Sequence, residues 1–397
     1  MGPHIMFRCG LMVATIAPLG CEVRGVIGSN RSMDGAGEVG DDGVGTAAED
    51  AGDDGSVTTG GQSLTGGTSP AVTTADGADD AMFDVGSPDA GRSCGAPMAT
   101  VCERGDDPWR AIGINCGGFD ASVSHTGDPR SMVVHTGMLG TSGVYVAREG
   151  EQMLILSSGD ASDIARTPQQ LKDDNDTCTL DSCPSQQLDT VASPQPALPK
   201  PLDHRRVHGE TDCAEDPTLV GLGDCSNTLH SEFRPLDGWV DYTDIRITAK
   251  VPEGADALAF EFAFFTAEYP LFVDQEHQES VYNDMYIAWL ESEGWTGNIS
   301  FDKEGHPVSI NSVFLDYRDS PVEGCLDCMA PELAGFAAQH HAGTDWLRTV
   351  APVVPGETIL LVIAVMDISD GLFDSAILLD GFEWTCTDLP PLTTPVG

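Results

Sequence analysis

Basic residues are scarce in this sequence. Its 397 residues include 63 Asp and Glu but only 19 Lys and Arg, which gives a formal net charge of −44. Proteins that hold nucleic acid need clustered Lys and Arg against the phosphates, so this composition excludes a nucleic-acid partner. The same charge opposes direct adhesion to an anionic membrane surface. The surplus of carboxylates favours divalent cations as partners.

Apolar runs long enough to span a bilayer are also missing near the start of the chain. The run from Cys9 to Gly20 follows Arg8 and is too short for a transmembrane helix. Its pattern predicts a secretory signal peptide over residues 1–21. The exit Leu19-Gly20-Cys21 resembles a bacterial lipoprotein cleavage site, which makes Cys21 a candidate lipidation site, with ordinary secretion as the alternative. We therefore expect a secreted or cell-surface protein, anchored to the outer membrane only through that lipid.

Cysteine usage agrees with export. Of twelve cysteines, Cys9 and Cys21 belong to the signal, and the remaining ten form an even set that predicts disulfides. The close pairs Cys178/Cys183 and Cys213/Cys225 are candidate bridges, although spacing alone does not define the connectivity. A redox role for Cys325 and Cys328 is disfavoured, because no βαβ pattern surrounds them.

The composition divides the chain into successive regions. Residues 22–90 are rich in Gly, Asp, Ser and Thr and predict a disordered acidic linker. Residues 91–235 form the N-terminal part of an ectodomain, 236–388 its β-sandwich core and 389–397 a C-terminal tail. Within 91–235, the segments 144–149 and 152–156 around Gly150 predict a β-hairpin.

Period-two alternation dominates the second half of the chain. Leu258, Phe260, Phe262 and Phe264 share one face, as a strand bordering a core requires. Further strands are predicted at 244–251, 284–290, 297–301, 308–316, 358–367 and 375–384. Many strands with few helices indicate a mainly β fold, an antiparallel, jelly-roll-like β-sandwich.

Two blocks of this half look like a known family. The segment FEFAFFTAEYPLFVDQEHQESVYNDMYIAWL (260–290) resembles the signature of the bacterial choice-of-anchor L domain. The segment 346–384 is similar to its closing block, with a Pro-Gly-Glu turn, an Asp-x-x-Asp loop, an Asp-Ser and a final Leu-Asp strand. Thr266 and Ala267 depart from the Ser and Glu usual in the family. The resemblance extends loosely over 94–386 and implies an exported surface module.

The acidic loop after the strand at 358–367 is the best candidate for a chemical site. Asp367, Asp370 and Asp374 lie within eight residues, and Gly371 allows a tight turn. Calcium takes six to eight oxygen ligands, often from carboxylates on one loop. Neighbouring strands would let Glu268, Asn283 and Asp284 complete the site. The alternative is a structural turn, because Asp and Gly are ordinary turn residues.

Other chemical patterns are weaker. The acidic run 173–176 lacks the Gly and Glu of an EF-hand, so a solvated loop is favoured. His204 and His208 lack the Glu of a zincin, and no Gly-x-Ser-x-Gly elbow is present. Glu268 with Asp367 is the pair that a glycoside hydrolase mechanism would use.

Aromatic residues near the first block suggest a ligand surface. Tyr269, Tyr286 and Trp289 are candidates for stacking on sugar rings. We expect a non-enzymatic adhesion or ligand-binding module, stabilised by Ca²⁺, whose partner is an extracellular glycan or a surface protein. The alternatives are a hydrolase acting on extracellular polysaccharide and a passive structural component. The residues do not define an oligomeric state.

Overall fold

The computed structural model describes residues 94–174, 194–202, 211–229, 238–270, 283–319 and 329–396. The predicted signal peptide, the lipidation site at Cys21 and the acidic linker lie outside these residues. The same holds for Cys178/Cys183, His204/His208 and Cys325/Cys328. In the described part of the chain, no helix is both long and apolar enough to cross a membrane.

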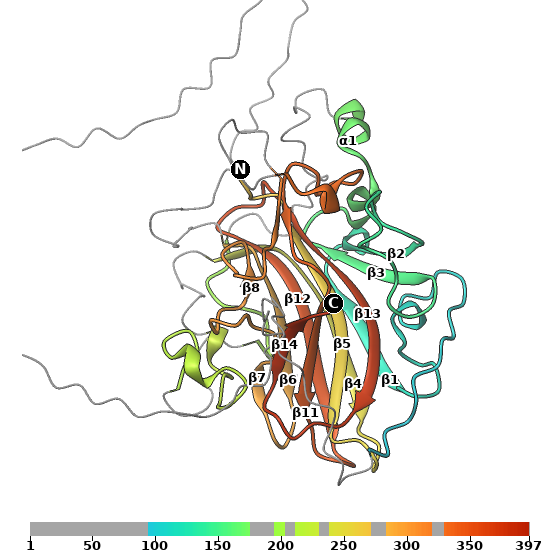
Figure 1. Ribbon diagram of the computed structural model, residues 1–397, viewed down its shortest axis with the longest axis vertical. Coiled ribbons are helices and arrows are strands. Elements are labelled where there is room, and N and C mark those ends of the chain that lie inside the picture. The colour runs from blue at the N-terminus through green and yellow to red at the C-terminus, as the bar shows by residue number, and fades with distance from the viewer. Residues whose placement is uncertain are drawn as a thin grey trace, which may run out of the picture. The chain divides into compact units, whose positions relative to one another are not determined.

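Two antiparallel sheets make up the described fold (Figure 1). The first sheet has the order β1-β4-β12-β6-β7, with β8 also paired to β6. Its strands are β1 (Ala121–Thr126), β4 (Trp239–Lys250), β6 (Met285–Glu291), β7 (Thr296–Asn298), β8 (Val308–Ser309) and β12 (Thr358–Ile368). The mainly β, antiparallel sandwich predicted from alternation is thus confirmed.

The second sheet has the order β14-β11-β5-β13-β3-β2, and β10 joins β5 to β9. Its strands are β2 (Met132–Thr136), β3 (Gln152–Ser157), β5 (Ala257–Thr266), β9 (Tyr317–Arg318), β10 (Ala342–Gly343), β11 (Leu347–Pro352), β13 (Ser375–Thr385) and β14 (Leu392–Pro395). Strands from both sides of residue 236 share each sheet, because β1 pairs with β4 and β3 pairs with β13.

Helices are short in the described residues. The α-helix α1 spans Pro168–Asp174, and 3₁₀ turns lie at Arg110–Ile112, Pro129–Ser131, Ala161–Ala165, Pro217–Leu219 and Pro331–Leu333. Asp128, Asp160 and Asp216 cap three of these turns by accepting a hydrogen bond from a backbone N–H. These three turns therefore begin where the sequence supplies an N-capping carboxylate.

The main core fills the space between the two sheets. Inward side chains of β4 and β12 meet those of β5 and β13, including the predicted row of four on β5. The ring centroids of Phe262, in the second sheet, and Tyr286, in the first, lie 4.4 Å apart. Two further apolar clusters cover the outer faces, one of them built on Leu198, Leu202 and Leu229 over β6 and β12. Both faces of the central strands are consequently buried.

The hairpin predicted around Gly150 is wrong. Strand β3 forms as expected, but its partners are β2 and β13. The backbone N–H groups of Arg148 and Glu149 instead donate to the buried carboxylate of Asp380. This side chain holds the segment before Gly150 as a loop, which local alternation could not reveal.

The strand predicted at 308–316 is also mostly wrong, because β8 ends at Ser309. Buried Asp302 accepts hydrogen bonds from Ser312 Oγ and from the backbone N–H of Val313, at 3.0 and 2.9 Å. The chain after β8 is therefore bent into turns around one carboxylate, which offers the backbone an alternative to a sheet ladder.

Three disulfides are present in the described residues, Cys94–Cys386, Cys102–Cys116 and Cys213–Cys225. The last confirms a pairing proposed from spacing. The first closes a sequence separation of 292 residues and joins the first described residue to the segment just after β13. The bridges support folding in an oxidising compartment.

We expect the Cys94→Ser, Cys386→Ser double variant to lose more stability than the Cys102→Ser, Cys116→Ser variant. A cross-link lowers the entropy of the unfolded chain, by about 3 kcal/mol for a loop of about 15 residues and by more for a longer one. Urea unfolding of both variants measures the difference. An equal or smaller loss at Cys94–Cys386 would contradict this account.

Candidate functional site

The predicted acidic ligands lie at one end of the sandwich. Glu268 follows β5, and Asp374 precedes β13, the strand that pairs Ser375 with Thr266. In the other sheet, Asp284 directly precedes β6, and Asp367 lies near the end of β12, where Met366 pairs with Met285. Antiparallel pairing therefore brings the ends of β5 and β12 and the starts of β6 and β13 to the same edge of the fold.

Asp284 connects the two sheets at this edge. Its Oδ1 accepts a hydrogen bond from the backbone N–H of Ile368, and its Oδ2 accepts one from Ser375 Oγ, each at 3.0 Å. Ile368 belongs to β12 in the first sheet and Ser375 to β13 in the second. Because Asp284 is fully buried, these bonds replace the water that its carboxylate has lost.

Three other carboxylates are buried near Asp284, and two of them, Glu268 and Asp367, have oxygens without the same support. Glu268, Asp367 and Asp374 are at most 4 % exposed. By hydrogen-bond geometry, Glu268 Oε2 and both carboxyl oxygens of Asp367 lack a partner among the described residues, although Ser158 and Asp284 lie close enough to Asp367 to interact with it. Burying a carboxylate oxygen without a partner is costly, and a bound cation is one way to offset this cost.

The electrostatics of the cluster follow from burial and mutual repulsion. Burial raises the pKa of Glu268, and the nearby Asp284, Asp370 and Asp374 raise it further. Burial likewise raises the pKa of Asp367 well above its usual value, followed by repulsion from Asp284 and Asp374. For Asp284, burial raises the pKa, and the bonds from Ile368 and Ser375 partly oppose that shift. These carboxyls are thus poised either to hold protons or to bind a cation.

Two predicted ligands have other engagements. Asn283 Oδ1 accepts a hydrogen bond from Asn311 Nδ2 at 3.0 Å. Asp370 lies at the rim, half-buried, and its Oδ1 accepts a hydrogen bond from the backbone N–H of Leu372 at 3.0 Å. Such a bond is typical of an Asx turn, so the structural role expected as the alternative applies to Asp370.

The arrangement is not a finished metal cage. Across the described ranges, no three Asp, Glu, His or Cys side chains are grouped as a bound metal ion would require. The donor set nevertheless suits a hard cation, because the orphaned buried atoms are carboxylate oxygens. Holding such an ion would require the side chains to rotate towards one another.

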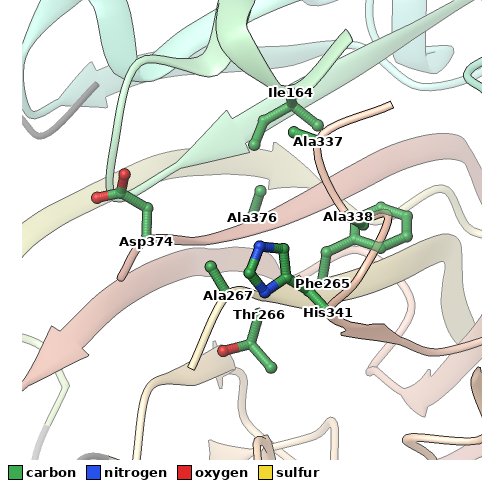
Figure 2. A pocket seen from close by; sticks show the side chains of 9 residues that line it. All are labelled: Ile164, Phe265, Thr266, Ala267, Ala337, Ala338, His341, Asp374 and Ala376. Atoms are coloured by element: carbon green, nitrogen blue, oxygen red, sulfur yellow. The ribbon is translucent and has the colours of Figure 1, made fainter. Parts of the chain in front are cut away.

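A small pocket borders the cluster and includes Asp374 in its wall (Figure 2). Its other lining residues are Ile164, Phe265, Thr266, Ala267, Ala337, Ala338, His341 and Ala376. The buried His341 ring donates from Nδ1 to the carbonyl oxygen of Tyr269 at 2.9 Å. Burial lowers the pKa of His341, which favours the neutral ring. The pocket has room for little more than a water molecule or an ion.

The three aromatic candidates do not border this site as exposed rings. Tyr269, Tyr286 and Trp289 are 6 %, 0 % and 2 % exposed. Tyr286 and Trp289 project from opposite faces of β6, and both faces are covered by apolar clusters. A strand with alternating side chains normally has one face exposed to solvent, but both faces of β6 are covered. In this conformation none of the three rings can stack on a sugar.

One residue near the cluster was not predicted from the sequence. Asp241 in β4 is 2 % exposed and acts on the Asp367 carboxyl by charge repulsion. Its backbone has a φ of 44°, a conformation that non-glycine residues rarely adopt. The acidic spacing of Asp241 and Asp244 is visible in the sequence, but the twist of the backbone that turns Asp241 towards the loop is not.

We expect the Asp367→Asn substitution to stabilise the chelator-treated protein increasingly as the pH rises. The folded-state pKa of Asp367 is raised, so the stability linked to its proton is complete below about pH 4 and is lost as pH rises through the folded value. Asn has no proton to lose, and the variant should gain up to about 1.4 kcal/mol over wild type for each pH unit crossed.

Urea unfolding of both proteins between pH 4 and 8 measures this difference. The exposed residue Asp173 provides the control, because Asp173→Asn removes the same charge outside the cluster. A difference between Asp367→Asn and wild type that does not change with pH would contradict the assigned burial.

Comparison with known proteins identifies the region that carries this site. Residues 249–383 match the family model described as the choice-of-anchor L domain, which spans Glu268, Asp284, Asp367 and Asp374. The upstream segment from residue 94, where we expected a looser resemblance, lies outside the match. Neither a curated protein nor a solved structure matches the chain. The match indicates a surface-associated protein, secreted or at the cell surface, and residues 249–383 of the chain carry a choice-of-anchor L domain.

Proposed function

We propose that this protein is a non-enzymatic binding module of the cell surface, and that Ca²⁺ stabilises one end of its sandwich. The ligands would be Glu268, Asp284, Asp367 and Asp374, with Asp370 at the rim. One observation carries the proposal. Glu268 and Asp367 are almost completely buried, yet by hydrogen-bond geometry three of their carboxyl oxygens lack a partner among the described residues.

The chemistry of these groups favours calcium over other ions. Ca²⁺ binds carboxylate and carbonyl oxygens at about 2.3–2.6 Å in flexible geometries, so it tolerates ligands from several separate loops. Zinc prefers His and Cys ligands. The only His in the pocket wall, His341, already uses Nδ1 in a hydrogen bond to Tyr269. The donor set is therefore made of hard oxygens.

A cation at this position would connect the two sheets. Glu268 and Asp374 adjoin strands of one sheet, whereas Asp284 and Asp367 belong to the edge of the other. The ion would also fix the loop between Asp367 and Asp374, which presents Leu372 to solvent with 51 % of its surface exposed. We propose that this loop is the adhesive rim of the module.

A protein ligand fits the rim better than a glycan does. Among the described residues, the exposed large apolar side chains are Met, Val and Leu, and none is aromatic. Sugar binding by stacking would need an exposed ring. A glycan-array signal from the purified protein would reverse this preference.

A hydrolytic role has less support than binding. The pair that such a mechanism would use, Glu268 and Asp367, is buried, and neither residue lines the pocket. A substrate would have to displace the loop before it reached either carboxyl group. Export through the predicted signal peptide, with lipidation at Cys21, remains part of the proposal and agrees with the disulfides.

We expect added CaCl₂ to raise the melting temperature of the chelator-treated protein. An ion that binds only the folded state stabilises it by about 2.7 kcal/mol at a concentration one hundred times its Kd. The rise should be larger at pH 8 than at pH 5, because ionised carboxylates bind the cation and protonated ones do not. Differential scanning calorimetry measures both effects.

Two variants separate this site from general charge screening. Asp367→Asn should lose most of the response to calcium, whereas Asp173→Asn, an exposed site on α1, should retain it. Equal responses of the two variants would remove the assignment of the site. A wild-type protein whose melting temperature is unchanged by millimolar calcium would overturn the calcium proposal itself.

A further inference from the structure

Asp241 occupies an irregular position in β4. Along most of their length β4 and β12 pair residue by residue, from Lys250↔Thr358 to Thr243↔Val365. The register then shifts, and Val240 pairs with Asp367. Asp241 lies within this shift with a φ of 44°. A bulge of this kind changes the direction of a side chain, and bulges often occur beside functional sites.

The Asp241 carboxylate lies against the acidic loop at Gly371. A methyl group built on Gly371 would overlap Asp241 Oδ2, and this oxygen would be its closest neighbour. The φ of Gly371 is not in the left-handed region, so its backbone does not require glycine. The missing side chain instead leaves space for the Asp241 carboxylate.

The same carboxylate lies close enough to Asp367 to repel its charge, and its neighbour Val240 pairs with Asp367. Asp241 is 2 % exposed and contributes to the raised pKa of Asp367, whose two carboxyl oxygens lack a partner by hydrogen-bond geometry among the described residues. Asp241 belongs to β4, the strand next to β12 in the first sheet, whereas Glu268 and Asp374 adjoin strands of the second sheet.

We infer that Asp241 is a further ligand of the cation, that Gly371 keeps its position open, and that this carboxylate selects Ca²⁺ over Mg²⁺. The inference rests on the proposed calcium site. Mg²⁺ demands near-octahedral geometry and usually keeps several of its waters, whereas Ca²⁺ accepts up to eight oxygens. An additional buried carboxylate raises the number of protein oxygens and leaves less space for water, so it favours the larger ion.

The test measures Ca²⁺ and Mg²⁺ affinities of the full chain by isothermal titration calorimetry. Gly371→Ala adds one methyl group and changes no charge, and Asp241→Asn removes the charge at nearly constant shape. The matched control is Gly294→Ala, because a methyl group there would meet nothing closer than 3.8 Å. For wild type and the control we expect the same preference for calcium.

In Gly371→Ala and in Asp241→Asn, we expect the Ca²⁺ affinity to fall at least tenfold and the Mg²⁺ affinity to change less. The ratio of the two affinities is the decisive readout, because general damage to the fold would weaken both ions together. Should Gly371→Ala fail to fold, Asp241→Asn alone decides the question.

Three results would count against specific claims. Wild-type affinities and an unchanged ratio in both variants would overturn the role of Asp241 while leaving the calcium site intact. Parallel losses for both ions would overturn the selectivity. A wild-type protein that binds neither ion would refute the proposed site, and with it the inference.

Discussion

Burial of like charges at one end of the sandwich is the constraint that dominates this molecule. Glu268, Asp284, Asp367 and Asp374 all lose contact with water where the two sheets meet. Burial is the leading influence on the pKa values of Glu268, Asp284 and Asp367, and for Glu268 and Asp367 repulsion from neighbouring carboxyls comes next. Asp284 is supported by hydrogen bonds to both sheets, whereas Glu268 Oε2 and the Asp367 oxygens lack such support among the described residues. Either protons or a cation must offset the remaining charge, which makes this edge sensitive to pH and ions.

The apolar core makes this arrangement tolerable. Strands β5, β6, β12 and β13 are buried over most of their length, and their ladders fix the positions of the loops that carry the carboxylates. Burial of apolar surface contributes roughly 25 cal/mol per Å², so a core of this extent can compensate for several unfavourable polar groups. The free-energy cost of burying these carboxylates is therefore local, and the apolar core of the sandwich offsets it.

The alternation of apolar side chains predicted a strand correctly where that alternation is strong and the burial in the fold follows the same pattern. It placed the row of Phe side chains on β5 in the core and brought Glu268, Asp284, Asp367 and Asp374 to one edge. It failed where one buried side chain redirects the backbone, as Asp380 does before Gly150 and Asp302 does after β8. The Asp380 bonds join residues 231 and 232 positions apart, and the Asp302 bonds span 10 and 11 positions. Neither set follows the two-residue period of a strand.

Two further features of the site could not be predicted for related reasons. Tyr286 and Trp289 are both buried because separate segments cover the two faces of β6, and alternation alone cannot show how many faces a strand buries. Asp241 belongs to the acidic edge because of a register shift and an unusual φ. The sequence shows an ordinary acidic residue in a strand, while the geometry makes it a neighbour of Asp367.

The Cys94–Cys386 bridge has a consequence for a protein that works outside the cell. It joins the first described residue to one just beyond β13, so the matched domain lies inside a closed covalent ring. A single cut by an extracellular protease in any loop within that ring leaves both pieces attached. Severed strands would stay in place beside their partners, and release of a fragment would require a second cleavage or reduction of the bond.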